Sequence, residues 1–567
     1  MIVPDAIIHL SSGGQRISRL RTRRKATEKD RYPCMSDILL NQIGFLPHGV
    51  KEVTFREGAV GATFRLVNDA TGETVAEYLQ SGPQDQINTG ERCSRGDFSS
   101  YDTPGVYRIT AGDETSCPFE IGEHVYDALI RDLTYMLHLQ RCGQALTEKE
   151  AGIFAHASCH DTPARIYGTE EHIDVTGGWH DAGDYGRYVV PAAKAVTDVL
   201  LGYLAAPGSL SFSMGFPASG EPDPLTEVRY EIDWMRKMQR ADGAVYHKVT
   251  CAGFPEMDAM PEEERAELIV SPVSNAAAAC FAATMAVAYR VYGSFDRDYA
   301  DTLLSAGRRA FDWLNERESD EGYHDPADIH TGEYRDNNWH DEWFWAAAAL
   351  FYATGEACYG QTAASLYEET RTGGLGWEET GFYGGTFYIH SPGADPGIRE
   401  KIVRRMEAAA DAAMEKGLSD AYGCANTVGH FRWGSNCDIA NSAMLFHILS
   451  DLEELPEDKK VSYRRMAERQ VNYLLGQNGT GYCFVTGHGT MCPVSPHHRP
   501  SVAKKTPMRG MLVGGADDAL QDAHAAEHLK GRAPALCYAD DWHSYSTNEI
   551  TIYWNSPLIY DLARMIE

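Results

Sequence analysis

The sequence contains no long run of apolar residues. Its most apolar stretch, Ala276 to Tyr289, falls short of the roughly 18 residues that a membrane-spanning helix needs, and Thr284 interrupts it. Such a stretch is typical of a helix buried among other helices. A membrane segment is therefore not expected.

An apolar signal core is also missing near the N-terminus. The first 34 residues carry eight Lys or Arg, but no hydrophobic run of the length found in secretory signals follows them. We interpret residues 1–34 as a disordered basic leader, with a transit peptide as the alternative. The expected location is cytoplasmic, although leaderless secretion or an incomplete N-terminus would give the same pattern.

Positive charge and cysteine are both scarce. The 567 residues contain 51 Lys or Arg against 81 Asp or Glu, which leaves a formal net charge of −30. A surface of that sign repels a phosphate backbone, so a nucleic-acid partner is not expected. Thirteen cysteines spread over so long a chain do not form the dense, even framework of small secreted domains. We expect mostly free thiols, with a subset available for a metal ion.

The pattern of apolar and turn-forming residues changes near residue 123. Before it, short strand-like runs are separated by Gly, Pro, Asn and Asp, which indicates a small β-sandwich over residues 35–124. After it, the apolar period becomes helical, and the sequence predicts a mainly α domain over residues 125–567 whose loops carry the chemistry. The expected helices cover residues 126–141, 191–205, 225–240, 273–292, 297–317, 341–353, 397–416, 437–452, 461–475 and 549–566.

Two aspartates lie three residues apart in a Gly-rich segment. Small residues separate Asp181 from Asp184, so both carboxylates can face one cavity. One carboxylate can then accept a proton from water while the other holds that water in line. An Asx-rich turn that caps the following helix explains this segment equally well.

A second acidic cluster lies near the C-terminus. Glu549 follows Trp542 and Tyr545, and such aromatic neighbours can raise a carboxyl pKa and keep the group protonated near neutral pH. The alternative is a glutamate near a helix start that only favours the helix dipole. One neutral acid and one ionised base are what glycoside hydrolysis requires.

With these residues, the chain resembles glycoside hydrolase family nine from Ile38 to the C-terminus. The resemblance implies an immunoglobulin-like domain packed on an (α/α)6 barrel, and cleavage of β-1,4-glucans with inversion of the anomeric centre. Besides the two acidic clusters, the matching blocks are residues 40–47, 245–250, 331–334, 433–436, 473–476 and 496–500.

The resemblance assigns roles to individual residues. It implies that Asp184 is the general base, Asp181 the second carboxylate that positions the water, and Glu549 the general acid. Inversion then predicts carboxyl groups of Asp184 and Glu549 roughly 6.5 to 9.5 Å apart. His497 and Arg499 match the family's His-x-Arg signature and are expected to hydrogen-bond sugar hydroxyls.

Other residues near the matching blocks are expected to support the site or bind sugar. Asp540 falls on the family pattern beside Glu549 and is expected to support that loop. Trp433 and Tyr545 are expected to stack on pyranose rings, whose C–H faces suit flat π surfaces. His247 is expected to hydrogen-bond substrate near the cleavage point. Core packing is the alternative for each aromatic candidate, namely Trp179, Trp339, Trp433, Trp542, Tyr545 and Trp554.

Two thiols and two imidazoles surround the first acidic cluster. Cys142, Cys159, His160 and His180 form the ligand set of a structural tetrahedral zinc, although isolated Cys and His usually bind nothing. The spacing is similar to the zinc site of family members that carry the immunoglobulin-like domain. A zinc ion there would anchor the loop with Asp181.

A calcium site is a further expectation from the resemblance. The segment from Asn337 to Glu342 looks like the family's calcium-binding helix entry, with Asp341 and Glu342 as candidate ligands. Carboxylates in the first turn of a helix also favour the dipole without any metal, so both explanations stay open. No organic cofactor is expected.

The leading hypothesis is a monomeric endo-β-1,4-glucanase that acts on cellulose, soluble β-glucans or cellodextrins. The alternative enzyme is an exo-acting hydrolase of the same family, for example one that releases glucosamine from chitosan oligosaccharides. An amine substrate calls for an additional acidic contact, of which the Asp181–Asp184 segment gives no sign. An inactive carbohydrate-binding protein would be expected to lack one of the three carboxylates, and all three are present.

Overall fold

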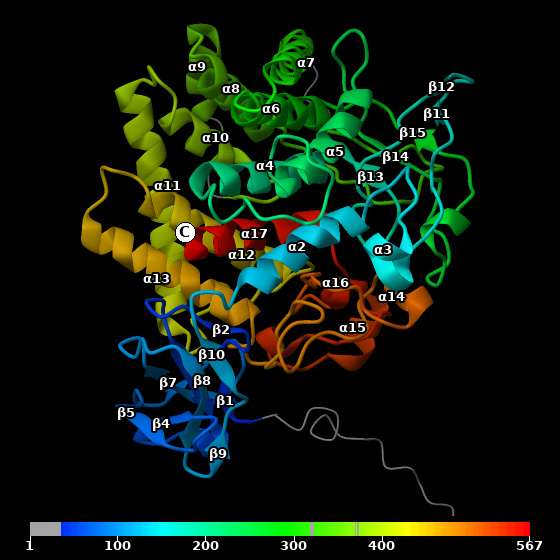
Figure 1. Ribbon diagram of the computed structural model, residues 1–567. Helices are drawn as coiled ribbons and strands as arrows, with labels where there is room; N and C mark the ends of the chain where they lie inside the picture. Colours follow the sequence, from blue (N-terminus) through cyan, green and yellow to red (C-terminus); the bar gives the residue numbers. More distant parts are fainter. Residues whose placement is uncertain (1–35, 318–321, 369, 371–373) are drawn as a thin grey trace, which may run out of the picture.

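The computed structural model describes residues 36–317, 322–368, 370 and 374–567, so the predicted leader lies outside the described residues. Within these ranges the chain forms a small β domain followed by a large helical domain (Figure 1). None of the described helices is long and apolar enough to cross a membrane.

The β domain is a sandwich of two sheets. Its strands are mainly antiparallel, but β2 and β10 pair in parallel. Phenylalanine side chains fill the interior; the ring of Phe98 lies 5.5 Å from that of Phe45 and 5.7 Å from that of Phe119. One sheet has the order β1 (Ile38–Leu39), β3 (Glu52–Arg56), β7 (Arg92–Asp97), β6 (Gln84–Asp85); the other has β2 (Gly44–Phe45), β10 (Phe119–Ile121), β8 (Gly105–Ala111), β4 (Thr63–Asn68), β5 (Thr74–Leu79), with β9 (Glu114–Thr115) on β8.

The helical domain is an (α/α)6 barrel, in which an inner ring of six helices alternates along the chain with an outer ring. The inner helices are α4 (Val189–Ala205), α6 (Asn275–Tyr292), α8 (His340–Thr354), α10 (Gly381–Ile389), α12 (Ser435–Ser450) and α17 (Ile552–Ile566). The outer helices are α2 (Asp127–Leu139), α5 (Asp223–Lys237), α7 (Arg297–Asn315), α9 (Ala357–Tyr367), α11 (Pro396–Ser419) and α13 (Glu457–Leu474). The barrel closes where α17 packs against α4.

Burial explains this division into two rings. Inner helix α6 is buried on all sides from Ala276 to Ala288, as expected for a helix surrounded by others. Outer helix α7 is amphipathic, with an apolar stripe that includes Leu303 and Phe311 facing inward. All ten predicted helices are present, whereas α9 and α10 were not predicted.

The site-bearing loops gather at the end of the barrel where α4 and α17 begin (Figure 1). A small sheet there has the order β12 (His172–Ile173), β11 (Ala164–Ile166), β15 (Ile269–Val270), β14 (Lys248–Thr250), β13 (Arg187–Tyr188). Short helices in the loops are α3 (Glu148–Ala151), α14 (Arg499–Lys504), α15 (Ala523–His528) and α16 (Tyr545–Asn548), with 3-10 turns at Glu57–Ala59, Gly152–Phe154, Pro261–Glu263 and Pro534–Leu536.

The β domain is attached to the barrel through buried polar contacts. Arg469 on α13 makes a two-point ion pair with Glu52 on β3, with N–O distances of 3.0 and 2.5 Å. The Asn41 side-chain amide donates to Asn472 at 2.9 Å and to the Tyr126 hydroxyl at 3.0 Å. These bonds hold the sandwich against α13 and the start of α2.

Candidate active site

The loop between β12 and β13 presents Asp181 and Asp184. The Asp181 amide donates to the Gly186 carbonyl at 3.0 Å, and the Asp181 carbonyl accepts from the Ile552 amide at 2.8 Å. The second bond fixes this loop to the start of α17. Gly183 lies very close to the loop that carries His497. A Cβ at Gly183 would be 2.2 Å from the His497 carbonyl oxygen, which excludes a larger residue.

Glu549 reaches the same place from the segment between α16 and α17. Its backbone forms a β-bridge with His497, and the His497 amide donates to the Asn548 carbonyl at 2.8 Å. The backbone amide of Gly183 lies close enough to the Glu549 carboxyl group to oppose the rise in its pKa. The structure therefore brings Asp181, Asp184 and Glu549 together from distant parts of the sequence.

Glu549 is in surroundings that keep it protonated. Burial raises the pKa of its carboxyl group well above the usual range, and the nearby charges of Asp184 and Asp181 raise it further. The positive charge of Arg499 and the Gly183 amide only partly oppose this rise in the pKa. A carboxyl group of this kind can act as a proton donor near neutral pH.

Asp184 has partners that stabilise its ionised form. Burial raises its pKa above the usual range, and the Arg499 charge, the Tyr188 hydroxyl at 2.9 Å and the Gly186 amide at 3.1 Å oppose this rise only in part. Burial and the neighbouring Asp184 raise the pKa of Asp181 well above its usual range, and a hydrogen bond from the Tyr334 hydroxyl lowers it. The three carboxyl groups can thus share acid, base and positioning functions.

His497 is fixed in one tautomer at the edge of this group. Its Nδ1 lies 2.6 Å from the Trp542 carbonyl oxygen, and because a carbonyl only accepts, Nδ1 carries the proton. Burial lowers the pKa of His497 to about 4, so the ring is neutral. Nε2 is then an acceptor suited to a hydroxyl group.

Arg499 and His247 both make hydrogen bonds within the protein. Arg499 is buried and donates to the Gly183 and Pro255 carbonyls, so it supports the aspartate loop; its contact with sugar hydroxyls stays a prediction. His247 is fully buried and stacks on Tyr323, and its two nitrogens bond the Ser274 hydroxyl and the Glu333 carbonyl. Because both nitrogens of His247 are engaged, the predicted hydrogen bond from His247 to substrate is wrong.

Asp540 lies beside the Glu549 segment, as expected. Its carboxylate accepts from the amides of Val494 and Ser495 and from the Asn548 side chain at 2.8 to 3.2 Å. Asp540 therefore acts on the site through Asn548, the residue before Glu549.

Aromatic rings lead from His497 into a cavity of about 410 Å³. The Tyr545 ring lies 5.9 Å from His497 and 4.9 Å from Trp433, whose side chain is 46% exposed. In contrast, Trp179 and Trp339 are buried in the core. Trp433 and Tyr545 are thus accessible, and their stacking on sugar rings stays a prediction.

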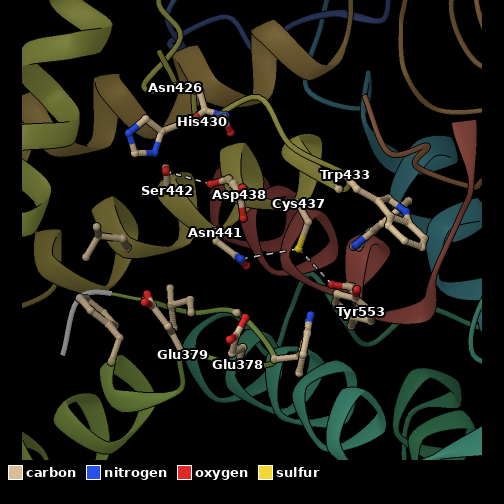
Figure 2. Close-up of a pocket in the computed structure, with 18 residues that line it drawn as sticks. Glu378, Glu379, Asn426, His430, Trp433, Cys437, Asp438, Asn441, Ser442 and Tyr553 are labelled. Carbon is tan, nitrogen blue, oxygen red and sulfur yellow. Dashed lines mark hydrogen bonds between the residues drawn. The ribbon is translucent and has the colours of Figure 1, made fainter. Parts of the chain in front are cut away.

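The cavity between α10 and α12 is polar (Figure 2). Glu378 and Glu379, from the segment before α10, face Asp438 and Asn441 of α12. A second cavity, of about 590 Å³, is lined by Pro496 and Trp542, among others. Pro496 precedes His497 in the chain, and the Trp542 carbonyl bonds the His497 ring, so this second cavity is adjacent to His497.

The four predicted zinc ligands meet in one buried cluster. One ligand atom from each of Cys142, Cys159, His160 and His180 lies within 4.8 Å of the others. The His160 Nε2 atom lies 3.0 Å from a Glu264 carboxylate oxygen, while its buried Nδ1 atom has no hydrogen-bond partner in the described part of the chain. Two sulfurs and two ring nitrogens, with a carboxylate behind one ring, fit a closed tetrahedral zinc site.

A third carboxylate lies beside the two predicted calcium ligands. Asp336 lies beside Asp341 and Glu342, and all three are buried. Both Glu342 carboxylate oxygens are buried without a hydrogen-bond partner among the described residues. Burial raises the pKa of Asp341 to about 7 and that of Glu342 well above its usual range. Such a set of oxygens fits a hard cation.

Comparison with known protein families matches residues 126–562 to "Glycosyl hydrolase family 9" and residues 35–116 to "Cellulase N-terminal ig-like domain". The chain belongs to glycosyl hydrolase family 9. The predicted family membership is therefore confirmed.

Relatives of this family 9 chain match nearly its whole length. It is 33% identical to a cellodextrinase from Butyrivibrio fibrisolvens, over 94% of this chain and 100% of the relative. It is 30% identical to endoglucanase D from Acetivibrio thermocellus, over 99% of this chain and 85% of the relative. A thermostable endoglucanase mutant from Alicyclobacillus acidocaldarius superposes with a TM-score of 0.87 at 36% identity, over 94% of this chain and 99% of that one.

Several residues of this family 9 site were missed from the sequence. Tyr188 and Tyr334 donate hydrogen bonds to Asp184 and Asp181. Tyr188 ends the Gly-rich segment that carries the aspartates, and Tyr334 ends the matching block 331–334. Asp336 lies just before the predicted calcium segment. The carboxylates of Glu378 and Glu379 carried no local signal, because only the folded chain brings them opposite α12 across the cavity.

Proposed function

We propose that this family 9 chain hydrolyses internal β-1,4-glucosidic bonds of glucans with inversion. The observation that carries the proposal is the meeting of Glu549, with its raised pKa, and Asp184, with partners for its ionised form. The relatives named cellodextrinase and endoglucanase support the substrate class.

In this mechanism Glu549 donates its proton to the glycosidic oxygen as the bond from that oxygen to the anomeric carbon breaks. A water molecule attacks the anomeric carbon from the opposite face and gives its proton to Asp184. Asp181, oriented by the Tyr334 hydroxyl, holds the water in line. Proton exchange with solvent then returns Glu549 to its acid form and Asp184 to its base form.

In this proposal the two cavities bind sugar units on either side of the cleaved bond. Trp433 and Tyr545 stack on sugar rings, and the carboxylates of Glu378 and Glu379 accept hydrogen bonds from hydroxyl groups. The neutral His497 accepts a hydroxyl proton through Nε2. Space on both sides supports cleavage within a chain over release of a single terminal unit.

Zinc at the Cys142, Cys159, His160 and His180 cluster is part of the proposal. His180 precedes Asp181, so this ion would hold the aspartate loop without contacting substrate. The Zn-binding triple mutant of the family 9 endoglucanase J30, with a TM-score of 0.86 at 31% identity over 92% of this chain and 99% of that one, is compatible with zinc in this fold.

Calcium at Asp336, Asp341 and Glu342 is proposed from the buried, unpartnered oxygens of Glu342. Such an ion would stabilise the start of α8. A rise in Tm on addition of Ca²⁺ is expected for the parent chain and not for Glu342→Gln. An equal rise in both proteins would contradict this assignment.

The activity is tested with cellopentaose and a glucosamine pentamer as substrates. The parent chain is expected to cleave cellopentaose into products of mixed length and to leave the glucosamine pentamer intact. Release of only glucose or cellobiose would indicate an exo enzyme. Glu549→Gln is expected to lower kcat by about 10² to 10⁴-fold with unchanged cellopentaose binding. The control Glu415→Gln, at an exposed position on outer helix α11, should retain full activity.

A further inference from the structure

A third cluster of metal-ligating side chains lies outside the sites described above. It consists of His524, on the short helix α15, and of Asp541 and His543, from the loop before α16. One ligand atom from each lies within 4.8 Å of the others. Neither the hydrolytic mechanism nor the zinc and calcium clusters use these residues.

Hydrogen bonds fix the two elements that meet here. Asp522 caps α15 by accepting from the Ala525 amide at 2.7 Å. The other Asp522 oxygen accepts from the Ser544 hydroxyl at 2.8 Å and from the amide and hydroxyl of Ser546 at 2.9 and 2.6 Å. The position of His524 relative to the 541–543 segment is therefore built into the fold.

The contacts of Asp541 leave one carboxylate oxygen directed at His524. The ring Nδ1 and the backbone amide of His543 both bond Asp541 Oδ1, at 2.7 and 3.0 Å. Asp541 Oδ2 lies 4.0 Å from His524 Nε2, too far for a hydrogen bond and suitable for a shared ion. The His528 ring, one helical turn further on, lies 4.3 Å from the His524 ring.

We propose that His524, Asp541 and His543 bind an exchangeable transition-metal ion such as Zn²⁺. Two imidazoles and one carboxylate suit borderline divalent ions and leave positions for water, whereas Ca²⁺ prefers oxygen ligands throughout. The side chains of His524, Asp541 and His543 are 20%, 41% and 55% exposed, so the ion can enter from solvent. This site differs from the buried cysteine–histidine cluster in its ligands and in its access.

A metal ion at this site can affect the active site through Trp542. Trp542 lies between the two loop ligands, and its carbonyl accepts the hydrogen bond that fixes His497. A bound ion clamps α15 to this loop. The site therefore couples metal concentration to the rigidity of the wall that holds His497.

The test is titration of the purified holoenzyme, its buried metal site already filled, with Zn²⁺ by calorimetry and with Co²⁺ by absorbance. We expect one further equivalent to bind, with Co²⁺ bands that lack a thiolate charge-transfer component. His524→Ala and His543→Ala should each weaken this binding by about tenfold or more, as should Asp541→Asn. His124→Ala, at an exposed histidine outside the cluster, should leave it unchanged.

Two results would overturn the proposal. One is the absence of a further equivalent in the parent chain, or its persistence with unchanged affinity in His524→Ala and His543→Ala. The other is displacement of the bound Co²⁺ by an equal concentration of Ca²⁺, which would contradict the imidazole ligands. Circular dichroism of each variant establishes that the fold is retained, so weakened binding reports the lost ligand.

Discussion

Glu549 and Asp184 carry the same functional group in different surroundings. Glu549 is partly buried beside two carboxylates, whereas Asp184 has a hydroxyl group, a backbone amide and a guanidinium group to stabilise its charge. Arg499 acts on both, because its charge lowers both pKa values while its hydrogen bonds hold the Gly183 carbonyl. The neighbouring groups, and not the residue type, thus decide which carboxyl group acts as the acid and which as the base.

Replacement of Arg499 tests this electrostatic role. In Arg499→Met the pKa values of Asp184 and Glu549 should both rise, by about one unit or more. The base then ionises at higher pH and the acid stays protonated to higher pH, so both limbs of the kcat/KM profile should move toward alkaline pH. The matched control Arg236→Met, on outer helix α5, should leave the profile in place. An unmoved profile in Arg499→Met would contradict the electrostatic role.

The sequence allowed the residues of the site to be found more reliably than their contacts. Asp181, Asp184 and Glu549 stand in motifs, and the structure brings them together as expected. His247 and Arg499 also stand in matching blocks, but their hydrogen bonds go to backbone carbonyls and a serine that only the folded chain brings near. A motif identifies a position and leaves the direction of its side chain open.

At the scale of elements, apolar periodicity located most helices of the barrel and failed at α10. Gly384 and Gly385 lie within this helix, and glycine ordinarily weakens a helix. A Cβ at Gly384 would lie 2.4 Å from the Phe344 ring on α8, so glycine is required for the close packing of these two inner helices. Tertiary contact therefore outweighs local propensity here.

The loop that carries the aspartates depends on its anchor. The backbone from Gln140 to Cys142 pairs with the segment from Gly178 to His180, through bonds of 2.7 Å at both ends. The four predicted zinc ligands lie on these two segments and the neighbouring Cys159–His160 pair. The anchor thus fixes the backbone directly before Asp181.

Loss of the proposed zinc ligand Cys159 tests this dependence. Cys159→Ser should remove bound zinc, lower Tm and reduce kcat by about 10 to 100-fold, because the loop with Asp181 and Asp184 loses its anchor. The control Cys358→Ser, at an exposed cysteine on α9, should retain zinc, Tm and kcat. Metal content by mass spectrometry and turnover of cellopentaose give the comparison. Full activity of a zinc-free Cys159→Ser protein would refute the anchoring role.

At the scale of the whole molecule, the change near residue 123 from short strand-like runs to a helical apolar period was enough to predict a β-sandwich followed by a helical domain. The attachment of the two was not predictable, because Asn41 and Glu52 find their partners on α13 more than 400 residues later. The two cavities are likewise products of the closed barrel and its loops. Local patterns cannot specify such distant contacts.

For the whole molecule, the proposed mechanism, in which acid and base act from opposite faces of the sugar, makes one stereochemical claim. Proton NMR of cellopentaose cleavage, recorded before mutarotation, measures it directly by resolving the anomers of the first products. The account predicts new reducing ends in the α configuration, with the signal absent in Glu549→Gln. New reducing ends in the β configuration would contradict the inverting roles of Asp184 and Glu549.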